Sequence, residues 1–321
     1  MRFNEEKLKD YARPLSDSEK QMCENAIRMV RDALENLGFQ SEGDINILNE
    51  ETYAYRLQMR SIHSSYKVTI FVKGSYANNT NVRQNSDVDI AIVREDVFYT
   101  EYRTGVTRED YKFHSVNEPF HIFKDDVEKS LKEKFGEINV ERGNIAICVN
   151  GNTYRKDADC VPCFRLRNYK NDKYFDENNY VGGIKIISDK GDVIINYPEQ
   201  HINNGVIKNK ATKYMYKKMV RVIKEMRYQL IESGNTNAQK TSSFGVEGLL
   251  WNIPDEYFNR YTIYGFVFEE LINYLNTHID ELINFKEPNN ILYMCDTNEK
   301  FLVYRKFIHD LTEYFNYSYE G

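Results

Sequence analysis

The stretch from Val72 to Val93 restricts the fold and chemistry of this chain more than any other part of the sequence. A Gly-Ser pair, Gly74-Ser75, ends one apolar run, and after eleven intervening residues Asp87 and Asp89 alternate into a second apolar run. Alternation along a strand places both carboxylates on one face, where they can reach the same cations. A glycine in a turn lets backbone N–H groups approach a phosphate closely, because no Cβ blocks the way. The stretch therefore predicts one binding site for a polyphosphate and one for divalent metal, the two parts that nucleotidyl transfer requires.

The bulk properties predict a cytoplasmic protein with small charged substrates. A chain of 321 residues suffices for two domains, and its 41% hydrophobic and 29% charged content is ordinary for a globular protein. The net charge of −6 argues against a large nucleic-acid partner or template, since phosphate neutralisation needs a basic surplus, although a local basic patch remains compatible with it. No run approaches the roughly 20 apolar residues that span a bilayer, and the first residues lack the apolar core of a signal peptide. We therefore expect no membrane association.

Periodicity predicts a mixed α/β half that precedes a helical half. A capping box at Ser16 opens a helix over about 16–37, and residues 51–62 fit a second short helix. Strands are expected at 66–72, 87–93, 144–149, 153–164, 183–188 and 193–197, a surface excursion at 94–117, and a helix at 124–135. Long helical periodicities follow at 210–232, 242–252, 262–277 and 298–316. We expect a core domain over 1–204 and a helical domain over 205–321.

A third carboxylate stands on one of the later strands. The segment R-K-D-A-D-C-V-P-C-F places Asp157 and Asp159 on one face, and Asp159 is flanked by the apolar Ala158 and by Cys160. A carboxylate that projects from a core strand is costly to bury unless it is paired or metal-bound. We therefore predict that Asp159 is the third metal ligand and that Asp157 is a structural residue or an outer neighbour of the site.

Three aspartates predict two-metal chemistry. Two Mg²⁺ ions roughly 3.5–4 Å apart, for which Mn²⁺ can substitute, could be bridged by Asp87 and Asp89, with Asp159 completing one of them. A 3′- or 2′-hydroxyl activated at one ion would lose its proton to Asp159, and the other ion would neutralise the leaving pyrophosphate. The predicted reaction is in-line attack of that hydroxyl on an α-phosphorus.

These residues resemble a known superfamily. A Gly-Ser pair, an eleven-residue gap, D-V-D and a later apolar-D-apolar strand are similar to the DNA polymerase β-type nucleotidyltransferase signature. G-S-Y-A-N-N-T-N-V-R-Q-N-S-D-V-D-I and A-D-C-V-P resemble more narrowly the bacterial cGAS/DncV-like nucleotidyltransferases, which make cyclic oligonucleotide signals in anti-phage (CBASS) defence. The resemblance implies an α+β fold: a polymerase β-like core with a mixed sheet, a helical domain like that of oligoadenylate synthases, and an active site in the cleft between them. It also implies that the N-terminal helix, over about 16–37, braces both lobes.

The resemblance continues into the helical half. Y-K-K-M-V-R-V-I-K-E-M-R and S-S-F-G-V-E-G-L-L-W-N are similar to the family's nucleotide-binding helix and its serine-bearing helix. By position they imply that Lys224 and Ser243 contact the triphosphate, in addition to Gly74 and Ser75. Nearby residues stay open as alternatives, because the loop between the two helices varies in length: Lys217, Arg221 and Ser242.

The implied function is template-independent synthesis of a cyclic oligonucleotide from NTPs such as ATP and GTP, with a dinucleotide favoured over a trinucleotide. A separate effector protein would read the product. Gly321 permits attachment of the C-terminus to a target, although an ordinary frayed terminus is the favoured interpretation. Two other functions remain open: nucleotidyl transfer to a tRNA end, a small molecule or a protein, and a catalytically silent nucleotide sensor. The presence of all three carboxylates disfavours the sensor.

The C-x-x-C pair Cys160 and Cys163 invites a zinc or redox interpretation. No second cysteine pair follows, and Pro162 lies between the two. We therefore predict buried thiols on a strand.

Overall fold

The computed structural model describes residues 3–42, 46–47, 55–61, 66–82, 87–116 and 119–317. The chain forms two compact units. The first, here the core unit, comprises residues 16–77 and 86–199, and the second, the helical unit, comprises residues 1–15, 78–85 and 200–321. The short segment 78–85 thus belongs to the helical unit, although core residues precede and follow it in the sequence.

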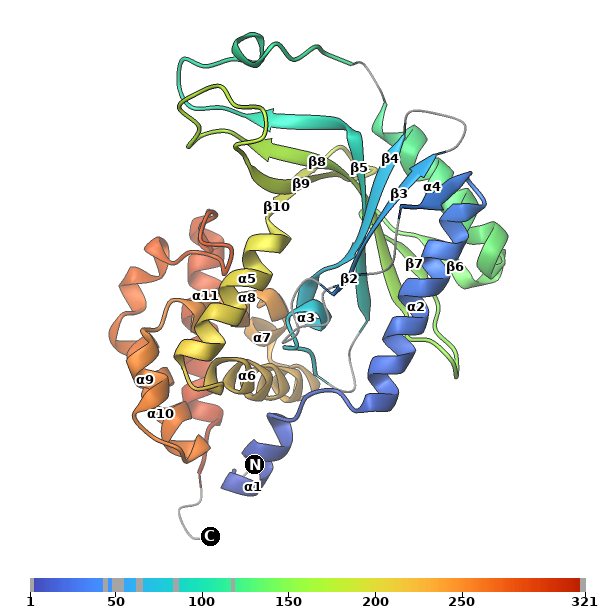
Figure 1. The fold of residues 1–321 in the computed structure, drawn as a ribbon. Helices are drawn as coiled ribbons and strands as arrows, with labels where there is room; N and C mark the ends of the chain where they lie inside the picture. The colour runs from blue at the N-terminus through green and yellow to red at the C-terminus, as the bar shows by residue number, and fades with distance from the viewer. Residues whose placement is uncertain are drawn as a thin grey trace. The chain divides into compact units, whose positions relative to one another are not determined.

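The core unit is built on a ten-stranded mixed sheet (Figure 1). Its main order is β1-β3-β4-β5-β8-β7-β6, while β2 pairs with β3, and β9 pairs with both β8 and β10. The bounds are β1 Phe39–Ser41, β2 Asn46–Ile47, β3 Tyr55–Ser61, β4 Lys67–Val72, β5 Val88–Glu101, β6 Val140–Arg142, β7 Ile147–Val149, β8 Ala158–Asn168, β9 Val181–Ile187 and β10 Val193–Asn196. Among the strand pairs described, β5 and β8 run parallel and the others antiparallel.

Two long helices, α2 (Asp17–Glu35) and α4 (Phe120–Phe135), pack against one face of this sheet (Figure 1). Phe164 of β8 points to this face and meets the ring of Phe123 of α4, with centroids 6.2 Å apart. The opposite face has its own apolar cluster, formed by Phe71, Ala91, Val93, Val161, Cys163, Ile184 and Ile186. Burial on both faces explains why β5 and β8 begin as nearly continuous apolar runs.

The helix boundaries follow local signals. Ser16 Oγ accepts the N–H of Glu19 and the Glu19 carboxylate accepts the N–H of Ser16, which is a complete capping box at the start of α2. α4 ends at Gly136, whose φ of +86° suits glycine. The predicted helices at 16–37 and 124–135 are confirmed. Among its described residues, the core unit also contains three short turns of helix: α3 Gly74–Ala77, η1 Arg108–Tyr111 and η2 Glu137–Asn139.

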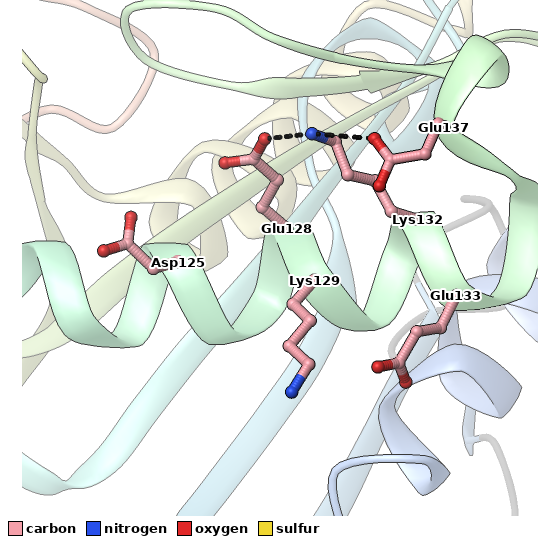
Figure 2. Close-up of a pocket in the computed structure, with 6 residues that line it drawn as sticks. All are labelled: Asp125, Glu128, Lys129, Lys132, Glu133 and Glu137. Carbon is pink, nitrogen blue, oxygen red and sulfur yellow. Dashed lines mark ion pairs between the residues drawn. The ribbon is translucent and has the colours of Figure 1, made fainter.

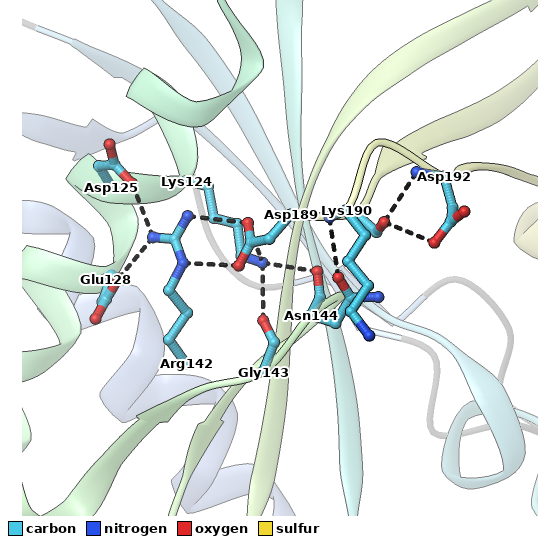
Figure 3. Close-up of polar contacts among 10 residues, drawn as sticks. Lys124, Asp125, Glu128, Arg142, Gly143, Asn144, Asp189, Lys190 and Asp192 are labelled. Atoms are coloured by element: carbon cyan, nitrogen blue, oxygen red, sulfur yellow. Dashed lines mark hydrogen bonds and ion pairs between the residues drawn. The ribbon is translucent and has the colours of Figure 1, made fainter.

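A buried lysine ties two turns of the core unit to α4 (Figure 3). The Lys124 side chain is fully buried, and its Nζ donates to the carbonyls of Gly143 and Asn144 at 3.0 Å each. It also lies 3.0 Å from an Asp189 carboxylate oxygen, which Arg142 contacts as well. These bonds join the turn between β6 and β7 to the turn between β9 and β10.

The helical unit is a bundle around one apolar core. Its elements are α1 Glu5–Tyr11, α5 Pro198–Ala211, α6 Met215–Glu232, α7 Thr236–Lys240, α8 Ser243–Trp251, α9 Asp255–Asn259, α10 Tyr264–Thr277, η3 Ile279–Asn284 and α11 Asn298–Tyr314. Met219, Leu249, Phe268 and Phe307, each from a different helix, are fully or almost fully buried in this core. Within the described ranges, no helix combines the length and the apolarity that crossing a bilayer requires.

Two sequence predictions about the core were wrong. The predicted helix spans 51–62, of which residues 51–54 and 62 lie outside the described residues. Residues 55–61 form instead the strand β3, in which Leu57 and Met59 are buried and antiparallel pairing with β4 continues the sheet. The surface excursion expected from residue 94 begins only after Glu101. β5 continues to that point because, beyond an irregularity between Arg94 and Phe98, it keeps its pairing with β8. Both errors arise because pairing with a distant strand overrides local pattern.

Candidate active site

Strand pairing brings the predicted metal-binding aspartates together on the core unit. Asp89 of β5 and Asp159 of β8 are direct partners in the parallel register. Neighbouring strands lie about 4.8 Å apart, and partners in register point to the same face. Asp87 immediately precedes β5 and lies two residues before Asp89, so it belongs to that face as well. This is the face that carries the Ala91, Val93 and Val161 cluster further along the strands.

Burial, with crowding second, raises the pKa values of Asp87 and Asp159. Desolvation, followed by repulsion from Asp159, raises the pKa of Asp87. Desolvation, followed by repulsion from Asp89, raises the pKa of Asp159. A divalent cation would relieve this repulsion, and carboxylate oxygens are the ligands that Mg²⁺ prefers. The donor set therefore fits such an ion.

The described side chains nevertheless do not form a complete coordination shell for a metal ion. Among the described residues, no three His, Cys, Asp or Glu side chains are already arranged around a metal position. Lys73 Nζ lies 3.3 Å from Asp89 Oδ1 and neutralises part of the negative charge. Binding of a cation at Asp89 Oδ1 would compete with this ion pair.

Gly74 lies directly against Asp89. Its φ is +71°, and a Cβ built on it would lie 2.1 Å from Asp89 Oδ2. The N–H of Lys73 donates to the Asp89 carbonyl at 2.9 Å, which holds the two segments together. Both the backbone conformation and the close approach therefore require glycine. The turn that opens α3, with Gly74 and Ser75, is adjacent to the carboxylate face.

The sequence reasoning missed Cys148. In the antiparallel pair β7–β8, Cys148 is the register partner of Asp159, and its thiol contacts the Asn150 side-chain oxygen at 4.0 Å. Burial, together with Asp159 and its neighbouring carboxylates, raises the pKa of Cys148 to about 11, so the thiol keeps its proton to donate. No local signal marks this cysteine, because its pairing is decided by strand register. Asp157 instead accepts the N–H of Gly151 and closes the loop before β8, a structural contact.

Cys160 and Cys163 confirm the prediction of buried thiols. Both side chains are fully buried and neither forms a disulfide. Burial raises the pKa of Cys163 to about 12, which leaves its thiol protonated and unreactive at neutral pH.

The predicted triphosphate lysine is deeply buried in the helical unit. Lys224 of α6 is 1% exposed, and its ammonium pairs with Glu247 of α8 and donates to the Thr80 carbonyl at 3.0 Å. Its alternative Arg221 donates from Nε to the Ala12 carbonyl at 2.7 Å. The contact of Lys224 with a triphosphate stays a prediction, and it would require the ammonium to leave these partners.

The two candidate serines differ in their roles at the start of α8. Ser242 is its N-cap, and its Oγ accepts the N–H of Gly245 at 2.9 Å. Ser243 is half-buried, and its Oγ lies 3.4 Å from Arg227 Nη1 and from the Tyr228 hydroxyl. Because the Ser242 oxygen is used in capping, Ser243 remains the better candidate for a phosphate, and its role stays a prediction.

A separate depression of about 470 Å³ lies along α4 of the core unit (Figure 2). Every residue that lines it is charged, and carboxylates outnumber ammonium groups: Asp125, Glu128, Lys129, Lys132, Glu133 and Glu137. Lys132 is engaged by Glu128 at 2.9 Å and by Glu137 at 3.2 Å. An acidic depression without aromatic side chains repels a triphosphate and offers no surface for stacking a base. It is not a nucleotide site.

Comparison with known proteins identifies the family of this chain. Residues 203–316 match the cGAS/DncV-like nucleotidyltransferase C-terminal helical domain, and residues 55–214 match the nucleotidyltransferase domain. A relative named cyclic GMP-AMP synthase CdnE03, from Staphylococcus schleiferi, is 59% identical over 320 residues, covering 100% of this chain and 99% of the relative. The chain belongs to the cGAS/DncV-like nucleotidyltransferase family. This family member is therefore a nucleotidyltransferase enzyme.

Solved structures of the family confirm the predicted fold class. The CdnE cyclic dinucleotide synthase of Elizabethkingia meningoseptica, solved with GTP and Apcpp, has a TM-score of 0.74 and 31% identity, covering 97% of this chain and 98% of that one. The CdnE c-UMP-AMP synthase of Rhodothermus marinus has a TM-score of 0.74 and 25% identity, covering 96% of each chain. A mixed sheet with a helical C-terminal domain is thus the architecture shared with these family members.

Proposed function

We propose that this family member joins ATP and GTP into a cyclic dinucleotide, with release of pyrophosphate and without a template. The observation that carries the proposal is the register of Asp89 with Asp159, with Asp87 on the same face, in a chain of this family. ATP and GTP are the proposed substrates because the relative that shares 59% identity along the whole chain is named a cyclic GMP-AMP synthase.

Each site residue has a proposed role in this reaction. Asp87, Asp89 and Asp159 would hold divalent metal, Mg²⁺ or Mn²⁺, which when bound supplies positive charge at the reacting phosphate. Asp159 accepts the proton of the attacking ribose hydroxyl, as the new O–P bond forms and the bond to pyrophosphate breaks. The proposed triphosphate contacts are Gly74, Ser75, Lys224 and Ser243.

The test is product analysis with purified protein. The chain is incubated with each pair of labelled NTPs and Mg²⁺ or Mn²⁺, treated with phosphatase, and its products are identified by chromatography and mass spectrometry. We expect a phosphatase-resistant cyclic product from ATP and GTP, which is absent with Asp87→Ala. Asp296→Ala is the matched control, because Asp296 is exposed in a surface ion pair with Lys300.

Other products would change the assignment. A trinucleotide ring would keep the reaction and correct the ring size. Nucleotide attached to RNA, to a small molecule or to protein would refute cyclisation and favour a transferase with another acceptor. Binding of NTPs in calorimetry without turnover under either metal would instead indicate a silent sensor.

The proposed biological role is anti-phage signalling through a separate effector protein that binds the product. Co-expression with a neighbouring effector gene should reduce phage plating, and Asp87→Ala should restore it. Gly321, the proposed attachment point, lies outside the described residues. Mass spectrometry that finds no adduct at the C-terminus in such cells would refute attachment.

A further inference from the structure

A buried arginine of the helical unit lacks the partner that a buried charge ordinarily has. Arg227 of α6 is 8% exposed, and burial lowers its pKa, although an arginine side chain keeps its proton in a folded protein. Within the described ranges, its side chain contacts the Thr241 carbonyl, the Ser243 hydroxyl and the ring of Tyr228, and none of these groups is a carboxylate. A buried charge is costly unless it is paired or binds an ion of opposite charge. The missing partner of Arg227 therefore points to an anion from outside the chain.

Other buried cations of this protein do have carboxylate partners. In four of them a carboxylate oxygen lies within 3.0 Å of the basic nitrogen: Arg94 with Asp96, Lys124 with Asp189, Arg165 with Glu95, and Lys208 with Asp255. Lys224 lies one turn before Arg227 on α6, and its ammonium pairs with Glu247. The charge of Lys224 is therefore balanced, whereas that of Arg227 is not.

Arg155 of the core unit is the nearest comparison. It too is buried, donates to a backbone carbonyl and lies over an aromatic ring. Burial lowers the pKa of Arg155, but the negative charge of Asp157 opposes this effect. Burial is also the main influence on the pKa of Arg227, and there the opposing group is the phenol of Tyr228 rather than a carboxylate. The described part of the chain thus offers Arg227 no balancing negative charge.

The Arg227 guanidinium lies against the start of α8, beside the serine that is the better candidate for a phosphate. Its Nε donates to the carbonyl of Thr241, the residue before the N-cap Ser242. Its Nη1 lies 3.4 Å from Ser243 Oγ, and the Tyr228 hydroxyl lies 3.4 Å from the same oxygen. Ser243 and Tyr228 are both only half-buried, so a ligand can reach this group without unfolding of the unit.

This group can supply the hydrogen-bond donors that a phosphate requires. A guanidinium presents a planar set of N–H donors that matches the oxygens of a phosphate. When Arg227 donates to Ser243 Oγ, the serine hydrogen remains available for an incoming oxygen. Ser243 is also the first residue of α8, a helix of nine residues, and the N–H groups of a first helical turn favour an anion. Positive charge, a hydroxyl donor and a helix N-terminus thus converge on one place.

We propose that Arg227 and Ser243 form a phosphate-binding site in the helical unit, and that this site holds a phosphate group of the NTP substrate. The identity of the ligand rests on the proposed function. Arg227 is then a substrate-binding residue in addition to the contacts proposed above, and its charge is available without disruption of the Lys224–Glu247 pair. Loss of either side chain should weaken NTP binding and leave the chemical step nearly unchanged.

The test is isothermal titration calorimetry of the wild type, Arg227→Gln and Ser243→Ala. The probes are a non-reactive ATP analogue with Mg²⁺, and inorganic triphosphate and inorganic phosphate, each in EDTA. We expect Arg227→Gln to weaken binding of the ATP analogue and of inorganic triphosphate by about 10- to 100-fold, the worth of a charged hydrogen bond. Ser243→Ala should weaken binding of the same two probes by about 10-fold. In turnover assays, Arg227→Gln should raise the KM for NTPs by about 10- to 100-fold, with kcat within about 3-fold of wild type.

Arg260→Gln is the matched control for the loss of one positive charge in the same unit. Arg260 lies 4.0 Å over the ring of Tyr257, so it too packs on a tyrosine. In contrast to Arg227, it is exposed and pairs with Glu270 at 2.7 Å. Binding of each probe to Arg260→Gln should stay within about 3-fold of wild type. An equal loss in Arg260→Gln and in Arg227→Gln would indicate a general effect of charge and overturn the site.

A purely structural role for Arg227 predicts other results. If Arg227 only holds the Thr241 carbonyl, Arg227→Gln should unfold at a lower urea concentration yet bind both triphosphate probes with wild-type affinity, and that outcome would overturn the proposal. Ser243→Ala leaves the bond to Thr241 intact, so wild-type affinity in this variant overturns the site even where Arg227→Gln does not fold. Weaker binding of inorganic phosphate, with unchanged binding of the ATP analogue, would overturn the assignment of the ligand to the NTP.

The two proposals fail differently. If the wild-type chain makes product, while Arg227→Gln and Ser243→Ala keep its affinities and its KM, the phosphate site is refuted and the proposed function stands. If the wild type makes no product with any NTP pair, the proposed function is refuted, and calorimetry with inorganic triphosphate alone decides whether Arg227 and Ser243 bind a phosphate.

Discussion

Replacing Gly74 by alanine should separate the geometry of the active site from the stability of the fold. The new Cβ would lie 2.1 Å from Asp89 Oδ2, whereas ordinary contacts begin near 3.4 Å. The carboxylate must therefore move by about 1 Å, a displacement that in an active site costs about 100-fold in rate. The φ of +71° adds a strain of about 1–2 kcal/mol for alanine.

Gly105→Ala is the matched control. Gly105 has a φ of +80°, but a Cβ there meets nothing within 4 Å. Both variants should lower the free energy of unfolding by about 1–2 kcal/mol, measured by urea denaturation. Only Gly74→Ala should also lose about 100-fold in the rate of pyrophosphate release, measured at saturating NTP and corrected for folded protein. A Gly74→Ala rate within about 3-fold of the Gly105→Ala rate would refute the argument that this glycine sets the position of Asp89.

Three further predictions follow from the charged groups of the core unit. Asp159→Asn should abolish product, yet in EDTA at pH 7 it should raise the Tm. The reason is that a carboxyl group whose pKa is raised in the folded state destabilises the folded state once the group is ionised. A lower Tm would contradict this. Mn²⁺ at about 100 times its Kd should stabilise the wild type by about 2.7 kcal/mol in thermal unfolding, and an equal effect on Asp159→Asn would argue against this residue as a ligand. Lys124→Met should lower the free energy of unfolding by about 2–3 kcal/mol in urea without changing the KM for NTPs, because it strips two carbonyls and Asp189 of a buried cation. A raised KM would contradict that purely structural role.

Much of the candidate site could be predicted because its signals are local. The positive φ of Gly74, the alternation of Asp87 with Asp89 and the capping box at Ser16 each depend on a few neighbouring residues. Such features can be predicted from a short stretch of sequence, because backbone conformation and strand alternation depend on neighbouring residues. The fold class followed from the same local patterns, together with the resemblance of the motifs to a family.

The errors and omissions concern contacts between distant residues. The strand β3 and the extension of β5 to Glu101 exist because each pairs with another strand, and neither pairing is visible in a window of the sequence. Cys148 meets Asp159 for the same reason. A one-residue change of register would turn that thiol to the other face of the sheet, so only the folded sheet decides its role.

The sequence by itself determined which groups are available: a glycine turn, three aspartates on or next to strands, and candidate lysine, arginine and serine side chains in a later helical half. The tertiary structure decided which of them meet. Parallel pairing set Asp89 beside Asp159, and packing of the helices turned Lys224 towards Glu247 and Thr80. Burial is the physical reason for the difference, because the partners that a buried charge requires can come from any part of the chain.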